Sequence, residues 1–529
     1  MQSHIQRTRK LLVVAVAAAL GGCAVTPHPL TADEQKAMLQ ADQRAMFADQ
    51  DPVSGPITLD EAMARALKYN LDQRVKVMEQ ALAHHQLDLS NFDLLPKLTA
   101  AAGYTHRSNV LASSSQDVVT GQQSLAPSTS SDRTLRRADL AFSWNVLDFG
   151  VSYYTARQNA DQVLAAGERR RKVVQMLMQQ VRLAYWQALG AQRLEQKIEP
   201  LLQQIHQALD DSRTIEKEQL KSPLTALSYQ RELLDLVLRL QSIRDELRQA
   251  KPRLAALMNI EPGQSFELSA PANFVEPKLD IAPANMEQIA LLHRPEVIEA
   301  DYKERISVAE THKAIAKLFP GIELSLGGHY DSNSYVVNDK WSDAGFQISW
   351  NILNLFNAHN VRAAAKAQRE LAREQRLALN MAVLTQVHVA WLDYNSRTEQ
   401  FQLTQRLNDV EQRILQHTRN ATASSAEGRL AEIRAAASAL MTELRRYQSY
   451  AALQGAYGQM LASLGLDPVP AAVASHDLHA LETAIRNTEQ QWQSPVVPEP
   501  VVPEAVPKAI PETAPKAAAS SGGAGVGML

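Results

Sequence analysis

The positions of hydrophobic and polar residues predict long helices separated by short strands. A capping box at residues 58–61 (TLDE) opens a stretch of helical periodicity that contains no glycine or proline up to about Phe92. Leu95-Pro96 then ends this helix, because proline cannot continue the backbone hydrogen-bond pattern. The first predicted element is therefore an uninterrupted helix from about residue 58 to residue 92.

After Pro96 apolar and polar residues alternate, which is typical of strands with one hydrophobic and one polar face. The clearest stretch is 139–146, with a copy at 345–352, and residues 322–327 and 98–103 follow the same pattern. Alternation alone fits any half-buried sheet. A membrane barrel is favoured because an aromatic girdle and a small, polar lumen-facing side are both present. The girdle residues are Trp144 and Trp350, and the lumen-facing residues are Ala141, Ser143, Gly345 and Ser349.

Each strand region is followed by a very long helix, predicted at about 151–217 and about 357–423. At 1.5 Å per residue such a helix reaches roughly 100 Å. Gly167, Gly190 and Pro200 inside the first one predict a kink. Its apolar residues follow coiled-coil spacing. They are Val174, Leu177, Val181, Ala184, Ala188, Ala191, Leu194, Ile198, Leu201, Ile205 and Ala208.

A shorter helix follows Ser222-Pro223 and ends near Met258, with a kink predicted at Pro252. This helix and the one before the strands together nearly equal the long helix in length. We therefore expect the two shorter helices to stack end to end beside the long one. Each half of the chain is then a helical hairpin with a strand pair at its far end.

The whole arrangement occurs twice. Residues 143–147 (SWNVL) return as 349–353 (SWNIL), an offset of 206 positions, and a QVxxA motif repeats at the same offset. Upstream the offset is 224, as Gly103 and Gly327 show. The first copy therefore has 18 more residues than the second in the loop between Gly103 and Trp144. A duplication of this length indicates that the whole fold is built from two copies of one structural unit. A structure predicted for one copy can therefore be compared with the structure predicted for the other.

Two strand pairs give four strands per chain, and an open four-stranded sheet cannot cross a bilayer because its edge N–H and C=O groups would lack partners. Closure needs about eight strands or more. A dimer would supply eight, with an interior largely filled by side chains, and a trimer would supply twelve with an open lumen. The small residues on the polar face favour the trimer.

The N-terminus has the features of a lipoprotein signal. Basic residues precede an apolar run at 11–20, which is too short to span a bilayer, and the LGGC sequence ending at Cys23 follows. Cys23 is the only cysteine, so no intramolecular disulfide can form, and we expect it to carry lipid. Ala24 follows it where an aspartate would signal retention in the inner membrane, which points to the outer membrane.

From about Gln493 the chain is rich in proline, alanine and glutamate, and we expect a disordered tail. The predicted organisation has five segments. They are a signal peptide (1–22), a lipidated segment (23–56), a first repeat (57–283), a second repeat (284–475) and a Pro/Ala-rich disordered tail (476–529).

The composition and the motifs argue against a catalytic, metal-binding or nucleic-acid-binding site in this chain. The net charge is −3 with both signs mixed, which gives no electrostatic case for nucleic acid. The 14 histidines form no cluster of metal-ligand spacing, and phosphate-binding loops, nucleophile elbows and zincin motifs are absent from the sequence. Beyond the signal no apolar stretch is long enough for a transmembrane helix. We therefore expect no catalytic residue, no metal and no cofactor.

The duplicated order of helix, strand, strand, long helix and helix resembles the TolC family of outer-membrane efflux proteins, as do the ITLDEA sequence at 57–62, the LGGC motif, and Asn70-Leu71 echoed by residues 294–296 (RPE). The resemblance covers about residues 57–470. It implies an α+β membrane protein: a homotrimer whose twelve-stranded outer-membrane barrel continues into a coiled-coil periplasmic barrel. It also implies an iris-like opening at the periplasmic tip.

The family's tip turns usually carry a glycine, a small apolar residue and a serine. The first turn here has Gln219 in place of glycine, followed by Leu220 and Ser222, and the second has a displaced Gly428 followed by Leu430. The resemblance implies contact with a periplasmic adaptor at these turns. Acidic residues near the tips would form rings of three in a trimer and favour cations, although Lys217 and Lys221 oppose this. The candidate constriction residues are Glu216, Glu218 and Glu427.

The function we expect is a passive duct in a tripartite efflux or type I secretion system, lipid-anchored in the outer membrane with its helices in the periplasm. Its partners would be two further copies of the chain, the adaptor, an inner-membrane pump of RND or ABC type and outer-membrane lipid, without nucleic acid. The alternative is a structural coiled-coil lipoprotein without channel activity, which leaves the Trp144 and Trp350 strands unexplained. A cell-wall enzyme lacks a candidate site.

Overall fold

The computed structural model describes most of the chain in eight stretches. They are residues 27–124, 126–218, 222–271, 273–279, 281–421, 426–470, 475 and 477–492. The signal peptide, Cys23, Gln219, Leu220 and the chain from 493 onward lie outside the described residues.

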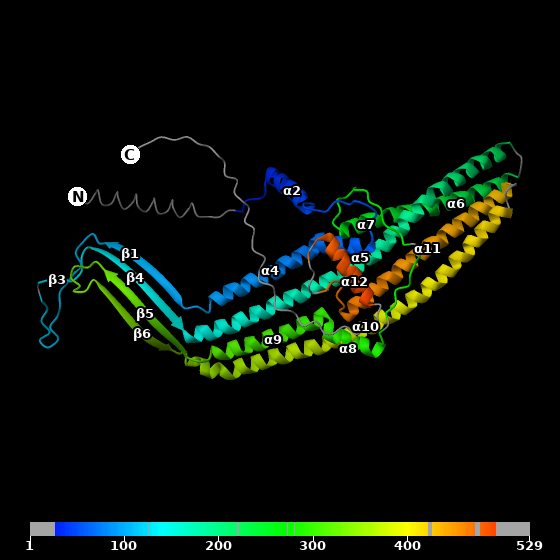
Figure 1. The fold of residues 1–529 in the computed structure, drawn as a ribbon. Coiled ribbons are helices and arrows are strands. Elements are labelled where there is room, and N and C mark those ends of the chain that lie inside the picture. The colour runs from blue at the N-terminus through cyan, green and yellow to red at the C-terminus, as the bar shows by residue number, and fades with distance from the viewer. Residues whose placement is uncertain are drawn as a thin grey trace.

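The molecule is a long bundle of helices with a sheet at one end (Figure 1). Its N-terminal helix is α2 (Ala32–Met46). The first repeat contains α3 (Leu59–Tyr69), α4 (Leu71–Phe92), β1 (Lys97–His106), β2 (Ala112–Ser113), β3 (Ser128–Thr129), β4 (Thr134–Asn145), α5 (Val146–Lys217), α6 (Pro223–Arg248) and α7 (Ala250–Leu257). The second contains α8 (Pro283–His293), α9 (Pro295–Ala316), β5 (Gly321–Asp331), β6 (Lys340–Ser349), α10 (Leu353–Ala421) and α11 (Ala426–Leu464), and α12 (Leu478–Trp492) follows.

Four strands form one antiparallel sheet in the order β1-β4-β5-β6, so the two repeats meet between β4 and β5. The four stretches of alternation predicted strands at the correct places. The short β2–β3 hairpin lies in the loop between β1 and β4. This is the loop that the change of offset marks as longer, and the β5–β6 loop at the corresponding place has no such hairpin.

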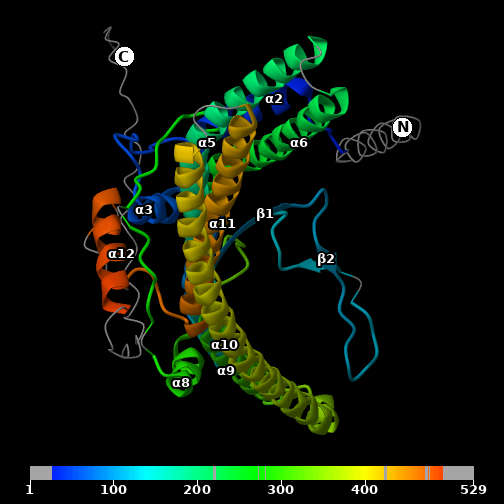
Figure 2. The same ribbon diagram turned by 90° about the vertical axis from the view of Figure 1, so that its right-hand side faces the viewer.

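The shorter helices stack beside the long ones as expected. α4 packs along the sheet-proximal part of α5 and α6 along its distal part, while α9 and α11 flank α10 in the same way (Figures 1 and 2). α5 also contacts α9 and α11, which joins the two hairpins. In the resulting curved layer, α4 and α6 form one edge and α10 the other.

Two predicted helices are each divided in two. The helix expected from 58 to 92 breaks at Asn70, whose backbone is extended and whose side-chain Oδ1 caps α4 by accepting a hydrogen bond from Gln73 N–H (3.2 Å). The helix ending near Met258 breaks at Gln249 between α6 and α7. The second break follows from Pro252, which has no N–H to donate to the carbonyl of Arg248.

The repeats share local geometry as well as order. Asn145 and Asn351 each accept a hydrogen bond from the backbone N–H two residues later, at the start of the long helices (3.0 and 3.2 Å). Asn259 and Gly465, 206 positions apart, both adopt positive φ (57° and 73°) after the last helix of each repeat. These residue types tolerate that conformation best, which explains their use as helix stops.

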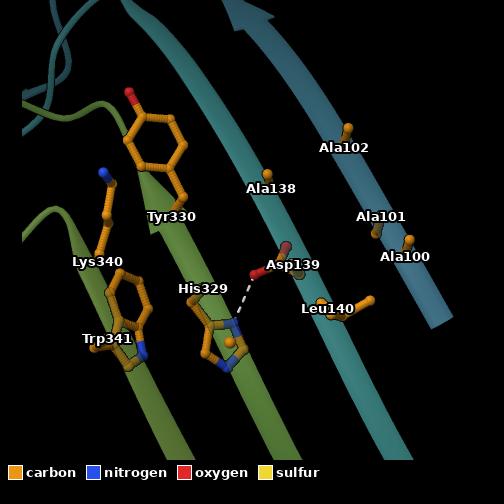
Figure 3. Close-up of a pocket in the computed structure, with 11 residues that line it drawn as sticks. Ala100, Ala101, Ala102, Ala138, Asp139, Leu140, His329, Tyr330, Lys340 and Trp341 are labelled. Atoms are coloured by element: carbon orange, nitrogen blue, oxygen red, sulfur yellow. Dashed lines mark hydrogen bonds and ion pairs between the residues drawn. The ribbon is translucent and has the colours of Figure 1, made fainter. Parts of the chain in front are cut away.

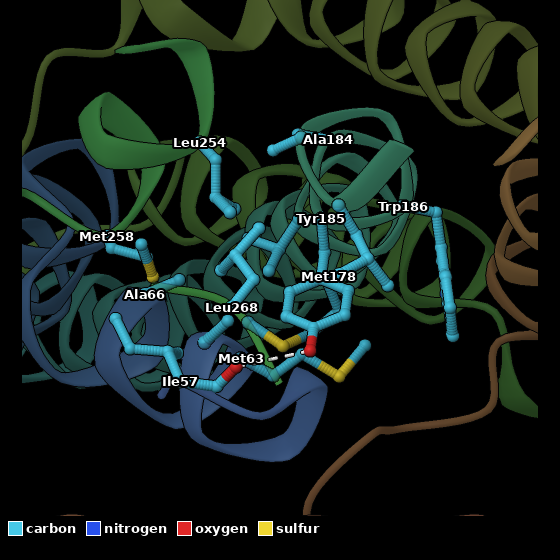
Figure 4. Close-up of a cluster of buried hydrophobic side chains, with 14 of the residues drawn as sticks. Ile57, Met63, Ala66, Met178, Ala184, Tyr185, Trp186, Leu254, Met258 and Leu268 are labelled. Carbon is cyan, nitrogen blue, oxygen red and sulfur yellow. Dashed lines mark hydrogen bonds between the residues drawn. The ribbon is translucent and has the colours of Figure 1, made fainter. Parts of the chain in front are cut away.

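The largest core lies where α3, α5 and α7 meet at the middle of the molecule (Figure 4). Tyr185 on α5 is buried there, and its hydroxyl reaches the carbonyl oxygens of Ile57 (3.1 Å) and Ser269 (2.6 Å). Ile57 in turn pairs with Leu268 in an isolated parallel bridge. The segments before α3 and after α7 are thereby attached to α5.

The prediction of a disordered tail from residue 476 is wrong for residues 478–492, which form α12 beside α3. Leu481 and Ile485 are buried at helical spacing. Glu489 pairs with the buried Arg182 of α5, although burial raises the pKa of the Glu489 carboxyl. The apolar stripe that contains Leu481 and Ile485 is short, and in the sequence it is a weaker signal than the composition of the proline-rich segment that follows it.

Two glycines inside α5 give a matched test of packing. A methyl group at Gly190 would lie 2.8 Å from Tyr447 Cβ, whereas at Gly167 it would meet only the flexible amide of Gln80 at 3.5 Å. We expect Gly167→Ala to stabilise the protein by about 0.5–1 kcal/mol through helix propensity. Gly190→Ala should instead destabilise it, because overpacking costs about 1–3 kcal/mol. Denaturant unfolding of both variants measures the difference, and equal stabilities would contradict the close approach of α5 and α11.

Candidate functional site

The four-stranded sheet has two chemically different faces. Strand register places one set of alternating side chains together on a predominantly apolar face. That set comprises Leu98, Ala100, Ala102, Tyr104, His106, Thr134, Arg136, Ala138, Leu140, Phe142, Trp144, Ile322, Leu324, Leu326, Gly328, Tyr330, Lys340, Ser342, Ala344, Phe346 and Ile348. The other face carries small and polar side chains, including Ala141, Ser143, Ser325 and Gly345.

The apolar face is uncovered. Leu98 (67%), Phe346 (74%) and Ile348 (60%) are largely exposed, although such side chains normally avoid water. The outer edges of β1 and β6 are also unpaired among the described strands. In water such a sheet would leave its apolar face exposed, and in lipid it would leave the backbone groups of two edges unpaired.

Trp144 and Trp350 lie at the helix-proximal end of the apolar face. Trp144 ends β4 opposite Leu324, with its ring edge-to-face against Phe149 at 5.8 Å. Trp350 follows β6 and donates its indole N–H to Leu318 O (3.0 Å). Both tryptophans occupy the level at which an interfacial girdle would lie.

The polar face contains a cross-strand cluster that sequence reasoning missed. His329 on β5 lies between two carboxylates, with Nδ1 2.7 Å from Asp139 on β4 and Nε2 3.2 Å from Asp343 on β6. The Trp341 ring stacks on the imidazole at 5.1 Å. Only the register brings these residues together, because they are distant in the sequence.

At the far end of the helices Arg419 and Glu432 (3.2 Å) join α10 to α11 within the second repeat, and two further ion pairs join the two repeats. Arg429 of α11 pairs with Asp211 of α5, and Arg434 of α11 pairs with Glu232 of α6. These pairs tie the second repeat to the first at the tip. Sequence analysis did not single out these arginines, because their partners lie about 200 positions away.

The predicted tip residues are placed only in part. Ser222 is exposed at the start of α6, Gly428 is buried, and Leu430 packs against the core between α5, α6 and α11. Glu216 accepts a hydrogen bond from Gln230 Nε2 of α6 (2.7 Å), and Glu218 is exposed. Gln219, Leu220 and the side chain of Glu427 are not among the described atoms.

Both edges of the helical layer expose apolar residues at coiled-coil spacing. On the distal part of α10 they are Leu403, Leu407, Val410 and Ile414. On α6 they are Leu224, Leu227, Leu234 and Leu238, and on α4 they are Val75, Met78, Leu82 and Leu89. Such seams predict partner helices on both sides of the chain.

Within the described stretches, no three histidine, cysteine, aspartate or glutamate side chains are grouped so as to hold a metal ion. Among the same residues, no helix combines the length and the apolar character needed to cross a lipid bilayer.

Comparison with known proteins identifies the fold. No protein-family model and no curated protein sequence matches the chain. Solved structures do match, among them the outer-membrane channel OprN, at 20% identity and a TM-score of 0.58 over 77% of this chain and 89% of that one. CusC, whose structures describe transmembrane channel formation, matches at 18% and 0.59 over 79% and 96%. The outer membrane protein VceC from Vibrio cholerae matches at 13% and 0.57 over 77% and 96%.

These structures are TolC-family outer-membrane channels, so the chain has the TolC-family fold. The resemblance drawn from the repeated motifs is thereby confirmed at the level of the fold. Four strands and two helical hairpins per chain agree with the α+β architecture that it implies.

Removing the two ion pairs that join the repeats at the tip should loosen it. We expect Arg429→Ala combined with Arg434→Ala to speed amide hydrogen exchange at the start of α6 and of α11 by roughly two- to tenfold, since exposed pairs contribute about 0.2–1 kcal/mol each. Hydrogen-exchange mass spectrometry measures this. Arg213→Ala is the matched control, because Arg213 pairs with Asp210 (3.1 Å) within α5 alone. Equal exchange in both proteins would contradict a role for the pairs in holding the tip.

Proposed function

We propose that the protein is the outer-membrane duct of a tripartite export system and that it works without catalysis. The observation that carries this proposal is the open sheet at the end of the long helices, with one bare apolar face, one polar face and two free edges. The structural similarity to the outer-membrane channel OprN supports it.

Three copies of the chain close the sheet into a barrel. The free edge of β6 in one copy pairs with the free edge of β1 in the next, which satisfies the backbone groups that lipid cannot. Three four-stranded sheets give twelve strands with the apolar face outward and the polar face around a lumen. The 72-residue α5 and the 69-residue α10 continue this lumen as a tunnel.

The helical seams support the same assembly. Counted from the tip, the α10 seam at residues 403–414 lies at about the height of the α6 seam at 224–238, because α10 ends at Ala421 and α6 begins at Pro223. The two seams lie on opposite edges of the chain. A head-to-tail contact between them repeats around a ring and closes it.

The tip is the gate of the duct. Arg429 and Arg434 hold α11 against α5 and α6, and opening requires these ion pairs to separate. A ring formed by Glu216, Glu218 and Glu427 at the constriction gives the open tip a preference for cations. The turns at Gln219, Leu220, Ser222, Gly428 and Leu430 contact the adaptor that drives opening.

The lipid anchor, the tryptophan girdle and the need for a pump follow from a location in the outer membrane. Lipid on Cys23 anchors the chain at the outer membrane, and Trp144 and Trp350 form the girdle at its periplasmic interface. An RND or ABC pump in the inner membrane supplies the energy and selects the cargo, so the duct needs no reactive group of its own.

The second candidate is a structural coiled-coil lipoprotein that bridges membranes. The length and seams of α5 and α10 fit it. It gives no reason for the bare apolar sheet, and it predicts no conductance.

Purified protein in planar lipid bilayers should show discrete, cation-preferring openings. We expect Arg429→Ala with Arg434→Ala to raise the open probability several-fold, because losing about 1 kcal/mol shifts a closed–open equilibrium by roughly fivefold. Glu427→Ala should reduce the cation preference, measured as the reversal potential in a salt gradient. Arg213→Ala should behave as the unaltered protein does. Well-folded protein that never enters lipid would overturn the proposal in favour of the structural lipoprotein.

The unaltered chain in detergent should have three times the monomer mass by native mass spectrometry. Leu403→Glu with Leu407→Glu should shift it to monomers, because buried charges at a seam remain unpaired. Both side chains are exposed in the single chain, so the substitution leaves its own core intact. Val337→Glu is the control, since Val337 is 97% exposed in the β5–β6 loop. A trimer that tolerates both glutamates would show that the α10 seam is not an interface.

A further inference from the structure

At its loop-proximal end the apolar face of the sheet carries aromatic and basic side chains instead of aliphatic ones. Tyr104 pairs with Arg136, and Tyr330 pairs with Lys340, all on the face that carries the bare apolar residues. Two aromatic rings and two cations thus stand at the level opposite to Trp144 and Trp350. Aromatic and basic side chains together are typical of the boundary between acyl chains and lipid headgroups.

The two cations have no counterion among the residues that the structure describes. Arg136 and Lys340 are exposed and form no ion pair with any described residue. The strand carboxylates, Asp139, Glu323, Asp331 and Asp343, have side chains on the polar face, and the apolar face carries none. Arg137 shows the contrast: it lies next to Arg136 but points to the polar face, where it pairs with Asp331 (3.0 Å). The positive charge of the apolar face is therefore uncompensated.

A depression of about 550 Å³ lies beside this rim (Figure 3). Its lining residues come from both faces of the sheet. On the apolar face small side chains are bounded by Leu140, Tyr330 and Lys340, and the small residues are Ala100, Ala102, Ala138 and Gly328. The polar face contributes Ala101, Asp139, His329 and Trp341. On the apolar face, small side chains with a cation at one end suit an acyl chain that carries an anionic head.

We propose that Arg136 and Lys340 bind the phosphate groups of a lipid in the leaflet at the loop end of the barrel, with one of its acyl chains in the depression. This inference rests on the proposed function, because it requires the sheet to stand in a membrane. Both cations donate charge-assisted hydrogen bonds to phosphate, and the low polarity of the surroundings strengthens them. Head and chain together select a phosphorylated lipid rather than a free anion.

Native mass spectrometry of the trimer with diphosphoryl lipid A tests the proposal. We expect retained lipid adducts, and Arg136→Gln with Lys340→Gln should weaken binding at least about tenfold, the effect of losing one hydrogen bond to a charged group. Ala138→Leu, which fills the depression, should also weaken it. Arg137→Gln is the matched control and should leave the adducts unchanged.

Three outcomes would overturn the inference. The first is equal binding by the double variant, and the second is equal loss of adducts in Arg137→Gln. The third is displacement of the lipid by millimolar inorganic phosphate, which would indicate a site for free anions. Bilayer recordings separate this from failure of the proposed function, because the double variant should still form channels of unaltered conductance. Channels without lipid preference would reject only the lipid site.

Discussion

The outer edges of β1 and β6 impose the constraint on which the rest of the structure depends. Their backbone N–H and C=O groups have no partner in the described part of the chain, and the sheet between them presents bare apolar side chains. Water would satisfy the edges but not the face, and lipid would satisfy the face but not the edges. Further strands within a membrane, as the proposed trimer would supply them, would satisfy both.

The helical region has the same property in a different form. Seams at coiled-coil spacing run along α4 and α6 on one edge and along α10 on the other, whereas the interior seams between α5, α6 and α11 are already buried. Duplication explains this arrangement, because the two hairpins are copies and each therefore has apolar seams on the same two sides. Joining two hairpins in one chain buries the inner pair of surfaces and leaves the outer pair exposed, and these are the surfaces that the proposed trimer would bury.

The copies have diverged where function is expected to differ. The β1–β4 loop has gained the β2–β3 hairpin, and the polar face has Asp343 and Trp341 in the second copy where the first has Arg137 and Leu135. The shared helix stops at Asn259 and Gly465 have kept their backbone geometry. The helix stops and the polar-face serines Ser143 and Ser349 are thus retained in both copies, while the loop hairpin and the polar-face positions 135 and 137 differ from their counterparts 341 and 343.

The sequence by itself determined the strands, the long helices, the duplication and the apolar and polar faces, because these follow from periodicity and offsets along one chain. It missed the break at Asn70 and the folding of α12, since a local cap or a short stripe is weak beside the signals of long helices and a proline-rich tail. The kink that it predicted at Pro252 is present as the break at Gln249. Only the tertiary structure decided which distant residues meet. The His329 cluster, the Arg429 and Arg434 ion pairs and the uncompensated Arg136 and Lys340 depend on strand register and helix packing, which periodicity does not encode.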